Sequence, residues 1–299
     1  MREDKKTSGI WAFPRDEWPR GLSQPHASGT YCAPLVVSPS RMSARPKIVV
    51  VANQKGGVGK TTTAVNLAAS VAAAEKRTLL IDTDPQGNAS SGVGIRPRSV
   101  QRSLYEALIG KASLAEVIVK TDIATLDVIP ATQDLAGAEI EFVDLPDRAE
   151  RLRKMLAALD GGKGGYEYVF IDCPPSLGLL TLNALVAADR VIVPMQCEYY
   201  ALEGLTHLMA TIDRIKGSYN PGLAVEGIVL TMFDPRNNLS HEVAGEVRRH
   251  FHVFEAIIPR NIRLSEAPSH GKPVLLYDAQ SKGAQGYLSL AREVIEAGR

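Results

Sequence analysis

A glycine-rich segment from Asn53 to Thr62 carries the clearest chemical signal in the sequence. It reads NQKGGVGKTT and follows a short run of β-branched residues. Its glycines let backbone N–H groups turn toward phosphate oxygens, and a helix that begins near Lys60 points its positive dipole end at the same anion. In such a loop the Lys60 ammonium reaches the β and γ phosphates and the Thr61 hydroxyl binds Mg²⁺. The segment therefore predicts a nucleotide phosphate site.

The segment departs from the strict phosphate-loop pattern at one position and adds a lysine at the next. The pattern GxxxxGK[ST] has a glycine at position 54, where this chain has Gln54. Lys55 is one lysine more than the loop requires, and it stands ahead of the glycines. From there its side chain could cross to phosphates bound by a second subunit.

Two further apolar runs end in the carboxylates that a magnesium–nucleotide site needs. Residues 78–82 end in Asp82, with Asp84 two positions later, and residues 168–172 end in Asp172. Parallel strands bring their carboxyl ends to one edge of a sheet, so we expect these acids beside the phosphate loop. Asp172 is expected to hold Mg²⁺ through water, and Asp84 to orient or deprotonate an attacking water. A lone aspartate there is also typical of a turn or helix cap, but the acids together favour the metal site.

The apolar runs alternate with helical segments along most of the chain. The runs are continuously apolar rather than alternating, which indicates strands buried on both faces of a parallel sheet. We predict an α/β fold with a mostly parallel, doubly wound sheet of about seven or eight strands and helices on both faces. The expected strands lie near residues 48–52, 78–82, 168–172, 190–194 and 227–232, and the expected helices near 59–74, 134–158, 179–187, 201–216, 240–251 and 282–297.

The first 45 residues differ in composition from the rest. Residues 1–45 hold both tryptophans and carry seven basic against four acidic residues, and they lack apolar periodicity. Two interpretations stay open. The segment is a flexible N-terminal extension that buries too little apolar area to fold, or it lies upstream of the true start at Met42. In both cases the phosphate-loop domain is expected to span residues 46–299.

Charge and composition exclude several classes of protein. The 299 residues include 34 Lys+Arg and 33 Asp+Glu, a net charge of +1, which argues against a protein that coats nucleic acid over its whole surface. Cys32, Cys173 and Cys197 lie far apart, so they predict neither a disulfide framework nor a thiolate metal site. The sequence lacks an apolar run of about 18 residues and a signal-peptide region, so we expect a cytoplasmic protein.

Three motifs together resemble one known family. KGGVGKTT at 55–62, DTDPQGN at 82–88 and FIDCPPSLG at 170–178 resemble the deviant Walker A P-loop ATPases, most closely the ParA/Soj chromosome and plasmid partition ATPases. The segment 259–273, PRNIRLSEAPSHGKP, is similar to the partition branch, with which Gln54 also agrees. The resemblance runs from about Lys47 to Glu296 and leaves the first 45 residues outside.

The resemblance implies an ATP-sandwich homodimer that hydrolyses ATP slowly and uses Mg²⁺. It implies that Lys55 contacts the partner's nucleotide, that Lys60 holds the local one, and that Asp84 acts in hydrolysis. The nucleotide-binding residues would be Lys55, Gly56, Gly57, Val58, Gly59, Lys60, Thr61 and Thr62, with Met232, Pro259 and Asn261 bordering the adenine. The metal-site residues would be Thr61, Asp82 and Asp172.

The resemblance also implies partners. Dimers of the family hold double-stranded DNA non-specifically, and Arg236 and Arg263 match positions implicated in that contact. A ParB-type centromere-binding protein would stimulate hydrolysis and release the dimers from the nucleoid, and no membrane partner is expected. An exposed arginine in a loop is also often only solvated, but a dimer doubles the arginines presented to one duplex.

Two rival classes share the phosphate loop. MinD-type ATPases end in a membrane-surface helix with a basic face, whereas here the last helix has a core-packing stripe within 288–295 and the acids Glu293 and Glu296 on its polar side. Nitrogenase-type reductases need two cysteines per subunit for a shared cluster, and Cys173 and Cys197 do not stand in cluster-like loops. A MinD-like or other cargo-positioning ATPase is the alternative to partition.

Overall fold

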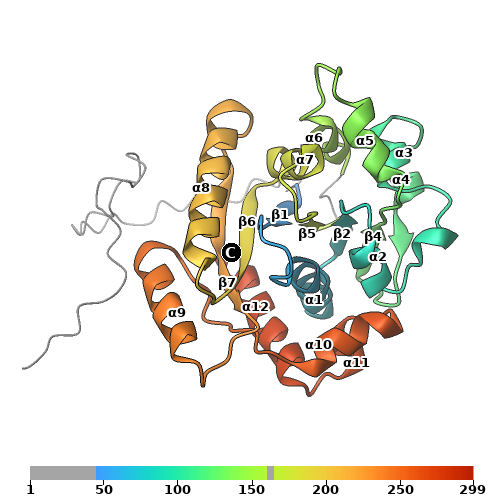
Figure 1. Cartoon of the computed structure of the whole chain (residues 1–299). Helices are drawn as coiled ribbons and strands as arrows, with labels where there is room; N and C mark the ends of the chain where they lie inside the picture. Colours follow the sequence, from blue (N-terminus) through green and yellow to red (C-terminus); the bar gives the residue numbers. More distant parts are fainter. Residues whose placement is uncertain (1–44, 160–164, 299) are drawn as a thin grey trace, which may run out of the picture. The chain divides into compact units, whose positions relative to one another are not determined.

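A seven-stranded sheet forms the centre of the computed structural model, which describes residues 45–159 and 165–298 (Figure 1). The strands run across the sheet in the order β3-β4-β2-β5-β1-β6-β7. All neighbouring strands are parallel except β3 and β4, which confirms the predicted mostly parallel sheet. The strands are β1 Lys47–Val51, β2 Thr78–Asp82, β3 Val119–Lys120, β4 Leu126–Ile129, β5 Tyr168–Asp172, β6 Arg190–Gln196 and β7 Ala224–Thr231.

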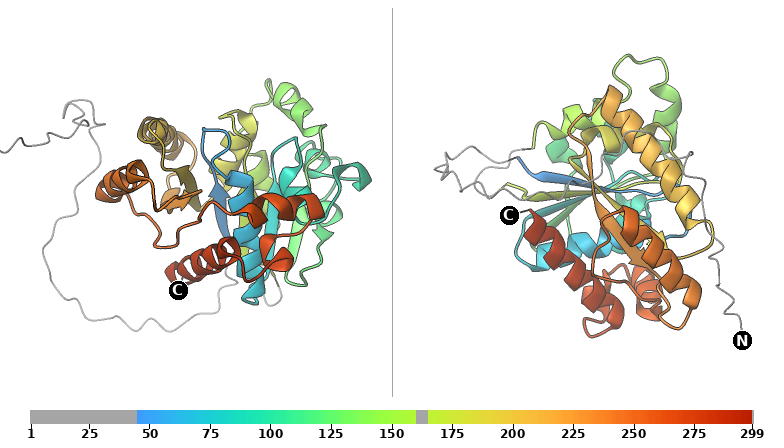
Figure 2. Two further views of the ribbon diagram at one scale, coloured as in Figure 1. Left: turned by 60° about the horizontal axis from the view of Figure 1, so that its bottom comes forward. Right: turned by 90° about the vertical axis from the view of Figure 1, so that its left-hand side faces the viewer.

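Helices cover both faces of this sheet, as the two views of Figure 2 show. Strand β1 explains why: Val49 and Val51 enter one apolar cluster, while Ile48 and Val50 enter the other. The first cluster is closed by α1, α2, α11 and α12, and the second by α3 to α9. The helices are α1 Lys60–Ala73, α2 Asn88–Gly92, α3 Leu104–Leu108, α4 Leu114–Val117, α5 Leu135–Glu141, α6 Arg151–Leu156, α7 Leu179–Ala187, α8 Ala201–Ser218, α9 Asn238–His250, α10 Ile262–Glu266, α11 Val274–Tyr277 and α12 Lys282–Ala297, with short 3₁₀ turns at Pro97–Ser99 and Ala267–His270.

The C-terminal helix α12 packs beside α1 in the first cluster. Its buried positions include Tyr287, Ala291 and Val294, so much of the expected apolar stripe faces the protein core. The Tyr287 hydroxyl lies 3.2 Å from the Thr63 hydroxyl of α1, and both groups are buried. The helix that follows the phosphate loop is therefore fixed from the far end of the chain.

The sequence-based prediction of one helix over 134–158 was wrong. The segment forms α5 and α6, and residues 142–150 between them are not helical. Pro146 stands in that interval, where it lacks an N–H donor and restricts the preceding residue. Strand β4 was not anticipated, because its four residues LDVI are interrupted by the polar Asp127. That carboxylate is 3% exposed and accepts hydrogen bonds from Lys120 and Tyr166.

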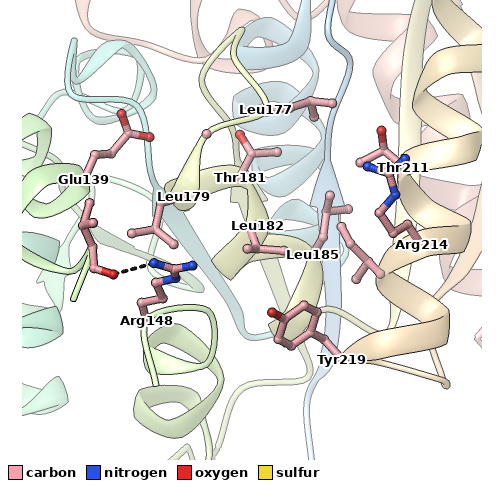
Figure 3. Close-up of a pocket in the computed structure, with 13 residues that line it drawn as sticks. Glu139, Arg148, Leu177, Leu179, Thr181, Leu182, Leu185, Thr211, Arg214 and Tyr219 are labelled. Carbon is pink, nitrogen blue, oxygen red and sulfur yellow. Dashed lines mark hydrogen bonds between the residues drawn. The ribbon is translucent and has the colours of Figure 1, made fainter. Parts of the chain in front are cut away.

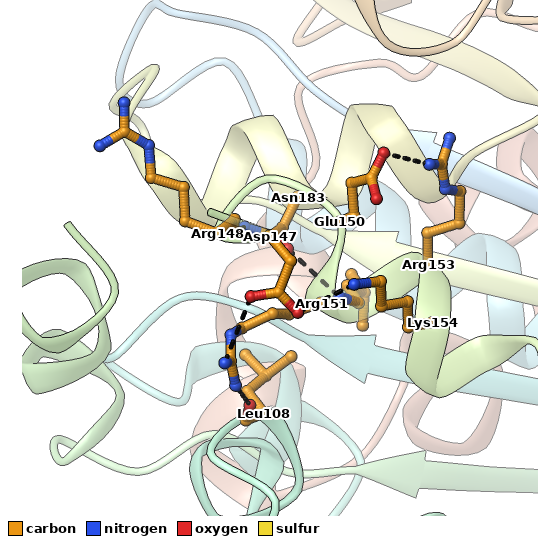
Figure 4. Close-up of polar contacts among 9 residues, drawn as sticks. Leu108, Asp147, Arg148, Glu150, Arg151, Arg153, Lys154 and Asn183 are labelled. Atoms are coloured by element: carbon orange, nitrogen blue, oxygen red, sulfur yellow. Dashed lines mark hydrogen bonds and ion pairs between the residues drawn. The ribbon is translucent and has the colours of Figure 1, made fainter. Parts of the chain in front are cut away.

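Polar contacts hold α6 against α7 (Figure 4). The Asn183 side chain accepts a hydrogen bond from the Leu152 N–H at 3.2 Å and donates one to the Arg148 carbonyl at 2.7 Å. Arg151 donates to the Leu108 carbonyl at 2.7 Å and lies 3.4 Å from Asp147. The Asn183 bonds therefore fix α7, the helix that follows the loop after β5, while the Arg151 bonds join α6 to the end of α3 and to Asp147.

The predicted N-terminal extension lies outside the described residues except for Arg45, whose guanidinium pairs with Asp189. Its two interpretations therefore stay predictions. Within residues 45–159 and 165–298, the helices are all too short or too polar to cross a membrane.

Candidate nucleotide site

The glycine-rich segment forms the loop between β1 and α1. Gly57 and Gly59 have φ angles of +75° and +85°, a left-handed conformation that glycine adopts without strain. Helix α1 begins at Lys60, and its preceding residue Gly59 offers no side chain to cap the first N–H groups. Uncapped N–H groups and the positive end of the helix dipole together favour an anion here.

Three hydrogen bonds anchor the loop, two of them to the neighbouring strands β6 and β7 and one within the loop itself. The Asn53 side chain donates to the Pro194 carbonyl of β6 at 2.7 Å and accepts from the Lys55 N–H at 3.0 Å. From β7, the Thr231 hydroxyl donates to the Val58 carbonyl at 2.8 Å, and this bond is buried. Strands β6 and β7 therefore help to hold the loop in shape.

The two lysines of the loop lie in different environments. Lys60 is 6% exposed, and its ammonium donates to the Lys55 carbonyl at 3.0 Å. Burial lowers the pKa of Lys60, while the charge of Asp172 and, less strongly, that of Asp84 oppose this shift. Lys55 instead points outward, with its side chain 41% exposed and its ammonium paired with Glu198.

Asp172 is the most unusual polar residue of this edge. It is fully buried, and both carboxylate oxygens lack a hydrogen-bond partner among the described residues. Burial raises the pKa of Asp172 well above its ordinary value, and the neighbouring Asp82 raises it further, whereas the nearby Thr61 hydroxyl and the Lys60 charge act in the opposite direction. A buried carboxylate without a partner is costly, and a bound cation would satisfy it.

Asp82 lies directly opposite Asp172, because the two residues are register partners on β2 and β5. Unlike Asp172, Asp82 accepts hydrogen bonds within the chain, from the Asp84 N–H at 3.1 Å and from the N–H and hydroxyl of Ser90, both at 2.7 Å. Burial raises the pKa of Asp82 to about 6, against the effect of these hydrogen bonds. Asp84 is 8% exposed and accepts the Gln86 N–H at 2.9 Å. The three acids thus meet at one sheet edge, as the strand order requires.

The residues expected to border the adenine lie near one another. Met232 is followed by Phe233, which bridges to Pro259 beside the sheet, and Met232 has a φ of +49°. Met232 lines a cavity of about 480 Å³ together with Glu198 and Arg260. The side chain of Asn261 instead caps α10, where it accepts the Arg263 N–H at 2.9 Å. The structure therefore brings Met232 and Pro259 together, with Asn261 two residues further along the chain.

The two candidate DNA-binding arginines are both exposed and both paired. Arg236 makes two hydrogen bonds to Asp234, at 3.0 and 3.1 Å, and these lower the pKa of Asp234 to about 2. Arg263 lies 2.9 Å from Glu266 and 3.2 Å from Asp278. Arg236 is the more exposed of the two, at 88% of its side chain against 47%.

A separate apolar hollow of about 460 Å³ lies between α7 and α8 (Figure 3). Leu182 and Leu185 of α7 line it, with the exposed side chains of Arg148 and Arg214 at its sides. Its lining includes Leu177, which belongs to the segment that follows Asp172, but none of the described phosphate-loop residues. The hollow and the nucleotide site therefore share only that segment.

Sequence reasoning missed three residues that shape the site: Asn53, Thr231 and Glu198. Each stands at or just after the carboxyl end of a strand, β1, β7 or β6. In the sequence, the signal that could have identified them is a polar residue at or just after the end of an apolar run. The strand order adds that β6 lies next to β1 and β7 next to β6, so the carboxyl ends of these parallel strands lie beside the phosphate loop.

The strand order, the glycine-rich loop after β1 and the uncapped start of α1 define a nucleotide-binding protein of the P-loop class. A model of an AAA domain family matches residues 46–225. The chromosome partitioning protein ParA of Myxococcus xanthus is 57% identical over 252 residues, covering 84% of this chain and 88% of that protein. The sporulation initiation inhibitor protein Soj of Bacillus subtilis is 54% identical and covers 84% of this chain and 99% of that protein. The chain belongs to the ParA/Soj family of chromosome-partitioning ATPases, which confirms the predicted partition branch.

Solved structures agree with this fold. Cobyrinic acid a,c-diamide synthase from Mycobacterium smegmatis, with a bound ATP analog and magnesium, has a TM-score of 0.73 and 36% identity over 85% of this chain and 97% of that chain. A putative plasmid partition protein from Borrelia burgdorferi bound to AMPPNP has a TM-score of 0.70 and 26% identity over 84% of this chain and 99% of that chain. The cell division ATPase MinD of Pyrococcus furiosus, at 24% identity, shares the fold with a TM-score of 0.70.

Proposed function

We propose that this partition ATPase binds magnesium–ATP at the edge formed by β1, β2 and β5. The observation that carries the proposal is the buried, unpartnered carboxylate of Asp172 beside Lys60 and Thr61. An oxygen ligand at the end of a phosphate loop suits Mg²⁺, which binds through one or two carboxylates and substrate phosphates. Bound there, Mg²⁺ would neutralise negative charge on the β and γ phosphates.

The loop residues then have distinct tasks toward the nucleotide. The backbone N–H groups of residues 56–59 and the start of α1 bind phosphate oxygens, with Thr62 completing the cradle. Lys60 places its ammonium on the terminal phosphates, and Thr61 and Asp172 hold the metal. Asp82 was predicted as a further metal ligand; because it already accepts three hydrogen bonds within the chain, we assign it to shaping the turn before α2. Met232, Pro259 and Asn261 are proposed to border the adenine.

Asp84 is the proposed hydrolytic residue, because it follows β2 beside the phosphate loop and is nearly buried. Its carboxylate would orient or deprotonate the attacking water. We propose that hydrolysis is slow in the isolated protein and that a ParB-type centromere-binding protein stimulates it. A group supplied in trans can contribute several kcal/mol to phosphoryl transfer, so such stimulation is chemically reasonable.

Dimerisation and DNA binding complete the proposal. The outward-pointing Lys55 would cross to the nucleotide of a second subunit, so ATP would assemble a sandwich dimer. Arg236 and Arg263 would then contact the phosphates of double-stranded DNA without reading sequence. Dimers would sit on the nucleoid in the cytoplasm until hydrolysis releases them. The packing of α12 into the core supports the absence of a membrane partner.

DNA binding measured with ADP, ATP and a slowly hydrolysed analogue across a salt series tests this cycle. Affinity should be much higher with ATP or the analogue, because two subunits present their arginines to one duplex. The variant Asp84→Ala should bind ATP, fail to turn it over and stay on DNA. Asp122→Ala, at an exposed turn outside the site, is the matched control and should behave as wild type. Equal affinity in all nucleotide states would refute the cycle, and normal turnover in Asp84→Ala would refute the role of Asp84.

A further inference from the structure

We propose that Glu198 restrains Lys55 in the free subunit, and that this ion pair has to open before Lys55 can reach the partner's nucleotide. The inference rests on the proposed role of Lys55 in the dimer and adds a second residue that sets how readily the dimer forms. Glu198 is a positioning residue in this scheme, since it acts through Lys55. The proposal stands on the contact between the Lys55 ammonium and the Glu198 carboxylate, two residues 143 positions apart in the chain.

The backbone of Lys55 is fixed, so only its side chain is free to move between two partners. Its N–H donates to the Asn53 side chain, and its carbonyl accepts the Lys60 ammonium, both at 3.0 Å. Asn53 is in turn bonded to the Pro194 carbonyl of β6. Opening the ion pair therefore requires a rotation about side-chain bonds and leaves the phosphate loop in place.

Glu198 is also held in position by its own backbone. It follows β6, its N–H donates to the Gln196 carbonyl at 2.9 Å, and its carbonyl accepts the Ala201 N–H at 3.0 Å. Its side chain lines the 480 Å³ cavity that contains Met232, beside the proposed nucleotide site. The next two residues, Tyr199 and Tyr200, are 55% and 67% exposed and form an edge-to-face aromatic pair. The carboxylate is therefore presented from a constrained turn.

The ion pair between Lys55 and Glu198 is weak enough to open when the dimer forms. The side chains of Lys55 and Glu198 are 41% and 44% exposed, so solvent and salt screen their attraction. Exposed pairs of this kind shift equilibria only modestly. A triphosphate carries several negative charges in a less exposed setting, so it can take the lysine from a single carboxylate. Lys60 differs, because it is buried and donates to the Lys55 carbonyl rather than to a carboxylate.

The test compares wild type with Glu198→Gln, which keeps the shape of the side chain but removes its charge. In sedimentation velocity with magnesium and ATPγS, Glu198→Gln should dimerise about two- to fivefold more tightly than wild type, because no ion pair has to open. The ratio between the two proteins should shrink as salt is raised from 50 to 500 mM, since salt screens the pair. Equal or weaker dimerisation of Glu198→Gln would overturn the proposal.

A matched control and a second measurement separate this inference from the proposed function. Glu167→Gln removes the charge from another exposed ion pair, with Lys76, and should leave dimerisation unchanged. In the nucleotide-free subunit, an amine-reactive reagent followed by peptide mass spectrometry should label Lys55 faster in Glu198→Gln than in wild type. An unchanged labelling rate refutes the restraint. If wild type stays monomeric with ATPγS, the proposed dimer fails, and the labelling still decides whether Glu198 holds Lys55.

Discussion

The phosphate loop and the two arginine segments present their charges in opposite ways. Lys60 and Asp172 are buried, and the Asp172 carboxylate has no hydrogen-bond partner among the described residues. Arg236 and Arg263 lie at the surface, and each is already paired with a carboxylate of its own chain. Burying an unpaired charge costs several kcal/mol, whereas an exposed ion pair contributes little and exchanges readily. The proposed nucleotide site is therefore built into the fold, while the proposed DNA contacts depend on exchanging one weak partner for another.

The largest effect is expected from Lys60→Ala, which removes a buried positive charge from the proposed nucleotide site. ATP turnover should fall by about 100- to 1,000-fold, because a preorganised positive charge at the transferred phosphate is lost. Steady-state ATPase assays and fluorescent-nucleotide titrations measure it. Lys76→Ala, at a half-buried lysine beyond the end of α1, is the control and should keep normal turnover. Turnover within a few fold of wild type in Lys60→Ala would contradict the assigned phosphate contact.

Asp172→Asn is expected to make the free protein more stable but to weaken its response to magnesium–ATP. Without nucleotide and magnesium, the variant should be more stable than wild type by about 1–2 kcal/mol at pH 8, because an unpartnered buried charge is removed. The raised pKa of Asp172 means that the folded wild type loses stability as pH rises from the ordinary carboxyl range through that pKa. The gain should therefore be larger at pH 8 than at pH 5.

Urea denaturation at the two pH values measures this gain. Added magnesium–ATP should stabilise wild type but not Asp172→Asn, since the variant lacks the carboxylate that is proposed to hold the metal. A variant that is less stable than wild type at pH 8, or one that magnesium–ATP protects equally well, would be inconsistent with an unpartnered carboxylate awaiting a metal.

A smaller effect is expected from charge reversal at the arginines. Arg236→Glu should weaken ATP-dependent DNA binding by about tenfold at 100 mM salt and flatten the salt dependence, because each dimer loses two phosphate contacts. Arg263→Glu should have a lesser effect, since Arg263 is less exposed and is shared by Glu266 and Asp278. Filter binding or fluorescence anisotropy across a salt series measures both, with ATP affinity expected to be unchanged.

Arg102→Glu is the matched control for these arginines. Arg102 pairs with Glu116 and is 47% exposed, the same exposure as Arg263. Its charge reversal should leave DNA affinity unchanged if position, rather than overall charge, governs binding. An equal loss of DNA affinity in all three variants would show that net charge alone governs binding. Arg236 and Arg263 would then not be specific DNA contacts, and the comparison with the buried site would no longer hold.

Much of the arrangement of the candidate site was predictable because its signals are local. A loop of glycines followed by Lys60 and Thr61 has few other uses, and acids that end apolar runs meet at one edge once the strands are parallel. The break between α5 and α6 and the short strand β4 were not predicted. Pro146 lies between α5 and α6, and Asp127 of β4 accepts hydrogen bonds from Lys120 of β3 and from Tyr166, which precedes β5.

The sequence alone determined the class of fold, the phosphate loop and the family, since these depend on residue types at short spacing. Only the tertiary structure distinguished residues of the same type that occupy similar positions in the sequence. Asp82 and Asp172 both end buried strands, yet Ser90 satisfies one and no described residue satisfies the other. Lys55 and Lys60 share one loop, yet one faces Glu198 at the surface and the other is buried. Ser90 is only eight residues from Asp82, whereas Glu198 is 143 positions from Lys55. Neither difference follows from residue type or spacing, because burial and hydrogen bonding depend on where the folded backbone places each side chain.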